Sequence, residues 1–194
     1  MVAGSLIARA VQAQSHTAPP PGGAAPPALQ PAHQGFYIGF SLGGGGLKFT
    51  ERDGRSTSRE ESVALTLLRL GVALHERLLV GANLGGWSKT DEEFVPDERT
   101  TTLVRINAEA IYYPVLGDVD VSVRGGLGIA RLGVDIGDTE IFKQDGAALH
   151  VGAGVEKRLT TRFALGASLD WHFARLSEDL DANYWELALQ FTWY

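Results

Sequence analysis

The sequence predicts an all-β fold, an eight-stranded antiparallel up-and-down transmembrane β-barrel that follows a disordered Pro/Ala-rich N-terminal segment. Three observations predict it. From Gly35 onward, eight stretches alternate between large apolar residues and small or polar ones. Short turns and long polar connections alternate between these stretches, which is the layout of a membrane barrel. Aromatic residues of the apolar set cluster near the strand ends, where rings favour a membrane–water interface.

The first 34 residues differ in composition from the rest of the 194-residue chain. Residues 1–13 hold a short apolar stretch that ends in "VQA", the small-residue spacing of a signal-peptidase site, and we interpret them as a partial signal peptide. A plain disordered tail is the alternative. Residues 14–34 are rich in Pro, Ala and Gly, which predicts an extended linker. The barrel is expected at residues 35–194.

The first four predicted strands begin with the alternating "GFYIGFSLGGG" at 35–45. Strands at 63–74 and 78–87 follow, separated only by His75, Glu76 and Arg77, which predicts a tight turn. "TTLVRINAEAIYY" at 101–113 is the fourth. In the second strand, Val63, Leu65 and Leu67 share parity with Arg69, so we expect either a β-bulge there or a protrusion of the strand beyond the bilayer.

The last four strands are predicted at 118–132, 147–156, 162–173 and 184–193. Pro114 to Gly117 and Lys157 to Thr161 provide the short turns. The other four connections, 47–62, 88–100, 133–146 and 175–183, are predicted to be long loops. They hold 16 of the 23 acidic residues and 8 of the 17 basic ones, and "TDEEFVPDE" at 90–98 is the densest acidic run.

Each predicted strand has one bulky apolar face and one face that mixes glycines with ionisable groups. Glycine weakens a strand exposed to water, whereas a narrow barrel interior needs small residues beside large ones. We therefore expect the apolar face to meet lipid and the polar face to fill the lumen, rather than the reverse arrangement of a lipocalin-like soluble barrel. The expected lumen network comprises Arg69, Asn83, Arg105, Asn107, Glu109, Arg124, His150, Glu156, Asp170, His172, Glu186 and Gln190.

Aromatic residues on the apolar face are expected at the two membrane interfaces. These are Phe36, Tyr112, Phe163, Trp171, Phe173, Trp185 and Trp193.

The stretches "GFYIGFSLGGG", "EAIYYPVLGDVDVSVRGGLGIA" and "WELALQFTWY" resemble the small outer-membrane β-barrel family of Gram-negative bacteria, the OmpA/OmpX-type or opacity-like porin superfamily. The resemblance covers residues 35–194. It implies location in the outer membrane, contact with its lipid and lipopolysaccharide, and a C-terminal assembly signal that the barrel-insertion machinery reads. That signal would comprise Trp185, Leu187, Leu189, Phe191, Trp193 and Tyr194.

The residues argue against several other classes of function. The absence of cysteine excludes disulfides and Cys-based metal sites, no His/Asp cluster has convincing metal spacing, and no cofactor motif is present. A net charge of −6 argues against nucleic acid. Asp170 and His172 share a face, but a protease of the outer-membrane aspartyl type needs a second Asp pair at the same rim. Asp118 and Asp120 lie at the opposite end.

A lipid A deacylase would need a Ser beside a lipid-facing His, whereas His172 has lumen parity and Ser177 lies in a loop. We therefore expect a monomer without catalytic activity, whose charged lumen is plugged and whose role is structural or lies in surface recognition of a ligand through long acidic extracellular loops. A narrow porin-like channel for small or hydrophobic solutes is the first alternative. An outer-membrane hydrolase of lipid A or peptide is the second.

Overall fold

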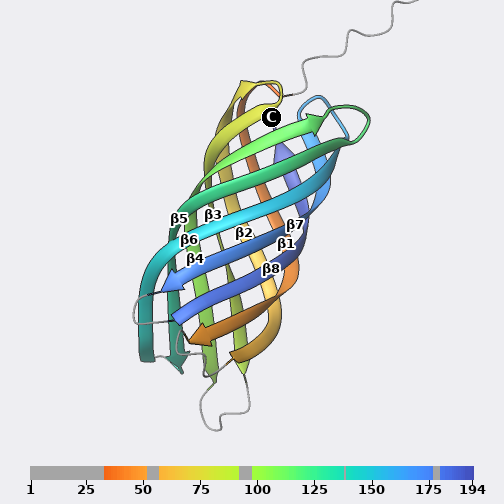
Figure 1. The fold of residues 1–194 in the computed structure, drawn as a ribbon. Coiled ribbons are helices and arrows are strands. Elements are labelled where there is room, and N and C mark those ends of the chain that lie inside the picture. Colours follow the sequence, from red (N-terminus) through yellow and green to blue (C-terminus); the bar gives the residue numbers. More distant parts are fainter. Residues whose placement is uncertain (1–32, 52–56, 92–97, 138, 177–179) are drawn as a thin grey trace, which may run out of the picture.

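Eight antiparallel strands form one closed barrel, in which each strand pairs with its sequence neighbours and β1 also pairs with β8 (Figure 1). The computed structural model describes residues 33–51, 57–91, 98–137, 139–176 and 180–194. The strands are β1 (Gly35–Glu51), β2 (Thr57–His75), β3 (Leu78–Asp91), β4 (Arg99–Val115), β5 (Asp120–Ile136), β6 (Thr139–Arg158), β7 (Phe163–Leu176) and β8 (Leu180–Trp193). The predicted fold class is confirmed.

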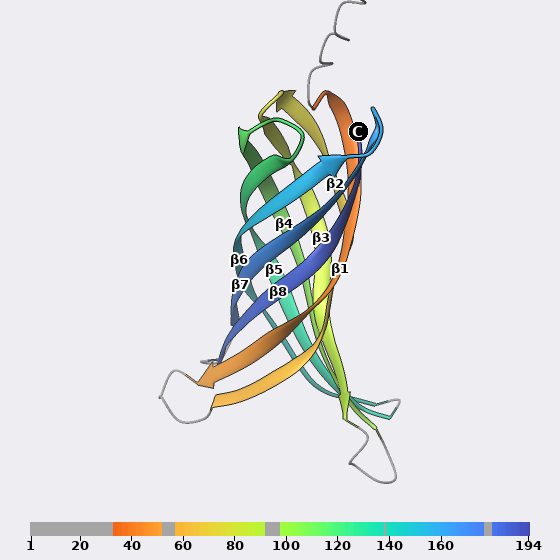
Figure 2. The same cartoon turned by 90° about the vertical axis from the view of Figure 1, so that its right-hand side faces the viewer.

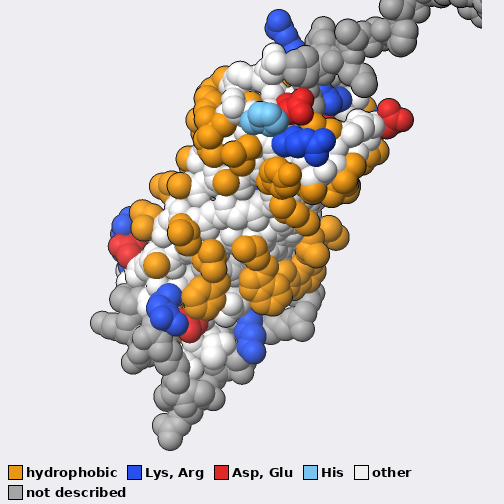
Figure 3. Space-filling model, turned by 45° about the horizontal axis from the view of Figure 1, so that its top comes forward, with side chains coloured by type: hydrophobic (Ala, Val, Ile, Leu, Met, Phe, Trp, Pro, Cys, Tyr) orange, Lys and Arg blue, Asp and Glu red, His pale blue; other side chains and the backbone are white. Residues whose placement is uncertain are grey.

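Many bulky apolar side chains lie on the outer surface of the barrel, and Figure 3 shows them on the face in view, with white surface between them. On β8, Leu187 is 58% exposed, whereas its neighbours Glu186 and Ala188 are 1% and 4% exposed. Apolar area left in water costs about 25 cal/mol per Å², so such a face requires a hydrocarbon environment. Closure of the barrel pairs the backbone groups of every strand, as a lipid environment demands. No helix in the described ranges is long and apolar enough to cross a membrane.

Of the two alternatives for the second strand, the structure shows the β-bulge. Thr66 pairs with Gly85 of β3, but Leu68 pairs with Leu84, so Leu67 is the extra residue. Facing β1, the register shifts at the same place. The bulge reverses the parity of β2, so that both Thr66 and Arg69 lie inside the barrel although they are three positions apart.

The four long loops predicted from the polar sequence are wrong in extent, because the strands continue through most of them. β1 runs to Glu51, β2 starts at Thr57, and only residues 137–138 separate β5 from β6. Thr-rich polar sequence pairs well in a ladder, as where the Thr90 and Thr100 hydroxyls lie 3.1 Å apart across β3 and β4. Figure 2 shows these long hairpins extending beyond the body of the barrel and bending apart.

The two ends of the barrel differ. The turns at 76–77, 116–119 and 159–162, the start of β1 and the C-terminus share one end, here called the turn end (Figure 1). The extended hairpins form the far end. The predicted signal peptide and all of the predicted linker except His33 and Gln34 lie outside the described residues. His33 departs from the predicted disordered linker, because its side chain is buried in the turn end.

Candidate functional site: the barrel interior

The structure places all twelve side chains of the expected lumen network inside the barrel, each 5% exposed or less. Strands β2 to β8 contribute them, because alternation turns every second side chain inward. The network contains arginines, carboxylates, amides and imidazoles. Buried ions of this kind are stable only when they are paired and hydrogen-bonded, so their contacts decide what the lumen can do.

Arg124 forms the shortest of the buried ion pairs. Its Nε and Nη2 donate to the two oxygens of Asp170 at 2.6 and 2.7 Å, a bidentate contact from β5 to β7. Its Nη1 donates to Gln190 Oε1 at 2.8 Å, and Gln190 Nε2 donates to Glu156 Oε2 at 3.2 Å. These bonds cross the lumen and connect four strands.

Arg105 occupies the centre of a second group. Its guanidinium donates to Asn83 Oδ1 at 3.2 Å, to Glu186 Oε2 at 3.3 Å and to the Tyr184 hydroxyl. Its Nη2 also lies 3.2 Å from His172 Nε2, which must accept because a guanidinium only donates. The charge of Arg105 is thus compensated by a carboxylate and shared among uncharged acceptors.

Glu109 joins a third group to the second. Arg69 Nε lies 2.9 Å from Glu109 Oε1, and His150 Nε2 lies 3.0 Å from Oε2. Asn83 Nδ2 donates to the same Oε2 at 2.9 Å. Asn83 itself accepts from Arg105 and from Asn107, whose Nδ2 lies 3.3 Å from Asn83 Oδ1. Each of the three network arginines therefore has its own carboxylate.

Apolar side chains fill the interior on both sides of this network. The far-end cluster comprises Leu47, Ala64, Trp87, Leu103, Ala130, Leu132, Ala148, Ala174, Leu176, Ala182 and Tyr184. The turn-end cluster comprises Tyr37, Leu79, Ile111 and Tyr113, with Ala73, Leu116 and Tyr194 packed against it. Most of the lumen network therefore lies between two clusters of mainly apolar side chains.

Asp170 and His172, which were considered as candidates for a hydrolase, both take part in the lumen network. Both oxygens of Asp170 accept hydrogen bonds from Arg124. The ring of His172 stacks on that of Tyr184 with centroids 4.2 Å apart, and its Nε2 faces Arg105 and Glu186. Ser177 lies outside the described residues. Neither side chain has a free surface on which a substrate and an activated water could meet.

The seven aromatic residues expected at the membrane interfaces keep outward parity. Phe36, Tyr112, Trp171 and Trp193 are exposed, and Phe163, Phe173 and Trp185 are half-buried. Near the turn end, Trp193 stacks with Phe40 at 5.8 Å and contacts Phe163 at 4.8 Å between ring centroids. Their position at a membrane interface stays a prediction.

Tyr194, the last residue, does not point outward as the alternate residues of β8 do. Trp185, Leu187, Leu189, Phe191 and Trp193 point outward, but the Tyr194 hydroxyl donates to Glu156 Oε1 inside the barrel at 2.6 Å and lies 3.1 Å from that of Tyr113. Burial raises the pKa of the Tyr194 phenol well above its ordinary value. An assembly signal read from outside would therefore present the five outward residues.

Sequence reasoning missed several interior residues. Tyr37, Leu79 and Tyr113 have lumen parity, so extending the alternation to every residue would have found them. Asp120 has the parity of Ser122 and is 1% exposed, although the sequence placed it at the rim. His33 carries no local signal, because it precedes β1 and its partners lie far away in sequence.

A closed barrel with a lipid-compatible exterior and a filled, charged interior defines an integral outer-membrane β-barrel protein. The chain belongs to the outer membrane protein beta-barrel domain family, whose model matches residues 10–192. This confirms the resemblance and the outer-membrane location predicted from the sequence. Short turns face the periplasm in such barrels, so we expect the turn end to be the periplasmic end. No curated protein sequence matches the chain.

Solved structures share the fold at low sequence identity. Neisserial surface protein A has 17% identity and a TM-score of 0.59, and the match covers 81% of this chain and 96% of that one. Ail, the attachment invasion locus protein of Yersinia pestis, has 17% identity and a TM-score of 0.57, with 81% and 99% covered. The N-terminal β-barrel domain of Pseudomonas aeruginosa OprF has 16% identity and a TM-score of 0.51, with 83% and 98% covered.

Proposed function

We propose that this protein is a monomeric, plugged outer-membrane barrel without catalytic activity, which serves as a membrane-structural element and presents its far end for recognition outside the cell. The observation that carries the proposal is the set of three buried pairs, Arg69–Glu109, Arg105–Glu186 and Arg124–Asp170. An eight-stranded barrel encloses a space that side chains just fill. Here they fill it with paired ions between two apolar layers.

A conducting pore would have to break these pairs. An ion crossing the lumen needs a continuous polar path, but every arginine of the network already has a carboxylate partner, and apolar clusters cover both sides. Removing one partner of a buried pair costs about 3–5 kcal/mol. This cost favours the plugged barrel over the porin-like channel.

The far end, which is the proposed recognition surface, has an acidic sequence, and this charge limits the kind of ligand that it can bind. The four connections that were predicted to be long loops carry twice as many acidic as basic residues. Ail was crystallised with the heparin analogue sucrose octasulfate. A polyanion of that kind would be repelled here, so a cationic partner, or lipopolysaccharide bridged by divalent cations, fits better. Saturable binding of sucrose octasulfate to this protein would contradict that choice.

Planar-bilayer recording tests the plugged lumen. We expect the refolded protein to insert without stable single-channel steps, because no water-filled path crosses the network. The Arg105→Ala variant serves as the matched probe, since it removes the central guanidinium. Stable steps in the wild-type protein that Arg105→Ala abolishes would overturn the proposal in favour of the channel.

A further inference from the structure

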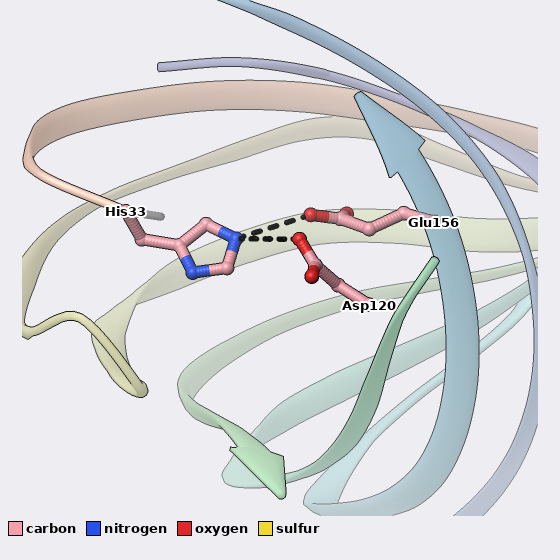
Figure 4. A group of neighbouring side chains, drawn as sticks. All are labelled: His33, Asp120 and Glu156. Carbon is pink, nitrogen blue, oxygen red and sulfur yellow. Dashed lines mark hydrogen bonds and ion pairs between the residues drawn. The ribbon is translucent and has the colours of Figure 1, made fainter. Parts of the chain in front are cut away.

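Three buried ionisable side chains meet at the turn end, outside the three arginine pairs described above. They come from distant parts of the chain: His33 precedes β1, Asp120 begins β5, and Glu156 lies in β6 (Figure 4). His33 Nε2 lies 3.3 Å from Glu156 Oε1 and 3.8 Å from Asp120 Oδ2. The three ligand atoms all lie within 4.8 Å of one another, and each residue is 2% exposed or less.

The other ring nitrogen fixes the tautomer of His33. Its Nδ1 lies 2.8 Å from the backbone carbonyl oxygen of Glu76. A carbonyl oxygen only accepts, so Nδ1 carries the hydrogen, and the lone pair of the neutral ring is on Nε2, facing the carboxylates. Metal-binding histidines are oriented in this way, with the second nitrogen donating to a backbone carbonyl. Stacking on Tyr113 at 4.0 Å holds the ring in place.

The two carboxylates are cross-strand neighbours in the β5–β6 pair. One oxygen of Asp120 accepts from the backbone N–H of Gly117 at 2.8 Å. The other, Oδ2, is buried and accepts no hydrogen bond, and it faces the cluster. The Arg158 guanidinium lies 3.5 Å from it on a partly exposed side chain. Two adjacent buried carboxylates repel each other, so the cluster is suited to a further cation.

We propose that His33 Nε2, Asp120 Oδ2 and Glu156 Oε1 bind a divalent transition metal ion of the zinc class at the periplasmic mouth of the barrel. Ligand bonds of about 2.1 Å in a tetrahedral site separate the ligand atoms by about 3.4 Å. The distances of 3.3 and 3.8 Å from Nε2 are close to this value, and the two carboxylate oxygens, which lie within 4.8 Å of each other, could adjust on binding. An imidazole beside two carboxylates suits zinc, whereas calcium and magnesium prefer oxygen ligands alone.

The bound ion would tie the N-terminal segment to the barrel wall. His33 is the first described residue of the chain and reaches β5 and β6 across the mouth, away from its own strand (Figure 4). An ion held there bridges three segments at once and compensates the two carboxylates.

Zinc titration of the refolded, tag-free full chain in detergent tests the proposal, with isothermal calorimetry as the readout. We expect one zinc ion per barrel, no displacement by excess calcium, and at least a tenfold loss of affinity in His33→Ala and in Asp120→Asn. His75→Ala is the matched control, because His75 is an exposed histidine at the same end, and it should bind zinc like the wild type. Heat-modifiable gel migration verifies that each variant is folded.

The outcomes separate a metal site from an internal ion pair. Absence of zinc binding by folded wild-type protein would overturn the proposal and leave His33 as an ionic contact of the mouth. Equal affinity in wild type and His33→Ala would also overturn it, because the zinc would then bind elsewhere. X-ray absorption of the zinc complex should show one imidazole and otherwise oxygen ligands, and a spectrum without imidazole would contradict the assignment.

Discussion

Strand β5 carries two arginine–aspartate pairs with the same short contact in opposite surroundings. In both, arginine Nε lies 2.6 Å from an aspartate Oδ1. The side chains of Arg124 and Asp170 are 1% and 7% exposed inside the barrel, whereas those of Arg131 and Asp145 are 58% and 60% exposed. Water screens the outer pair and competes for its hydrogen bonds. The two pairs therefore contribute unequally to the stability of the barrel although their contact distances are equal.

Arg124→Ala should therefore destabilise the barrel strongly, by about 3–5 kcal/mol, because it leaves the Asp170 carboxylate buried without its partner. Arg131→Ala should leave the unfolding midpoint unchanged. Urea unfolding in lipid vesicles, followed by tryptophan fluorescence, measures both. Equal effects of the two substitutions would show that the interior of the barrel is as hydrated as its surface.

At the scale of the strand, alternation predicted most of what the structure shows. It gave the eight strands, their two faces and an irregularity near Arg69, which the structure shows to be a bulge at Leu67, because a one-residue change of parity is visible in the sequence. It did not give the strand ends. Lys89 and Thr90 were predicted to lie in a loop, but β3 continues to Asp91 because it pairs with β4 there. Pairing with another strand is not visible in a local pattern.

The close approach of strands makes a second prediction, again within β5. A Cβ on Gly128 would lie 1.9 Å from the carbonyl oxygen of Ile106 and 2.6 Å from the Cα of Asn107, both on β4. A Cβ on Gly133 would meet nothing within 4 Å. Gly128→Ala should destabilise the barrel by about 1–3 kcal/mol through overpacking.

Gly133→Ala is the matched control and should leave stability unchanged. The same urea unfolding experiment compares the two. A neutral Gly128→Ala would mean that β4 and β5 lie farther apart than the structure shows, and that the small residues of the lumen face are not required by close packing.

At the scale of the whole molecule, sequence reasoning reached the closed barrel and the polarity of its faces, but not the layering of the lumen. The far-end cluster includes Leu47 and Leu176, which the sequence placed in loops. His33, Asp120 and Glu156 are far apart in the sequence, and only the closure of the barrel brings them together. Contacts across a barrel depend on register and stagger around the whole circumference, and one strand's pattern does not contain them.

The orientation of the two faces is the central claim, and spin-label accessibility tests it most directly. The chain has no cysteine, so single cysteines at Leu127 and Leu187, and at Thr161 in a turn, give unambiguous labels. In vesicles, labels at Leu127 and Leu187 should collide mainly with oxygen, which dissolves in lipid, and the Thr161 label mainly with a water-soluble nickel complex. Preferential collision of the nickel complex with the labels at Leu127 and Leu187 would contradict the account.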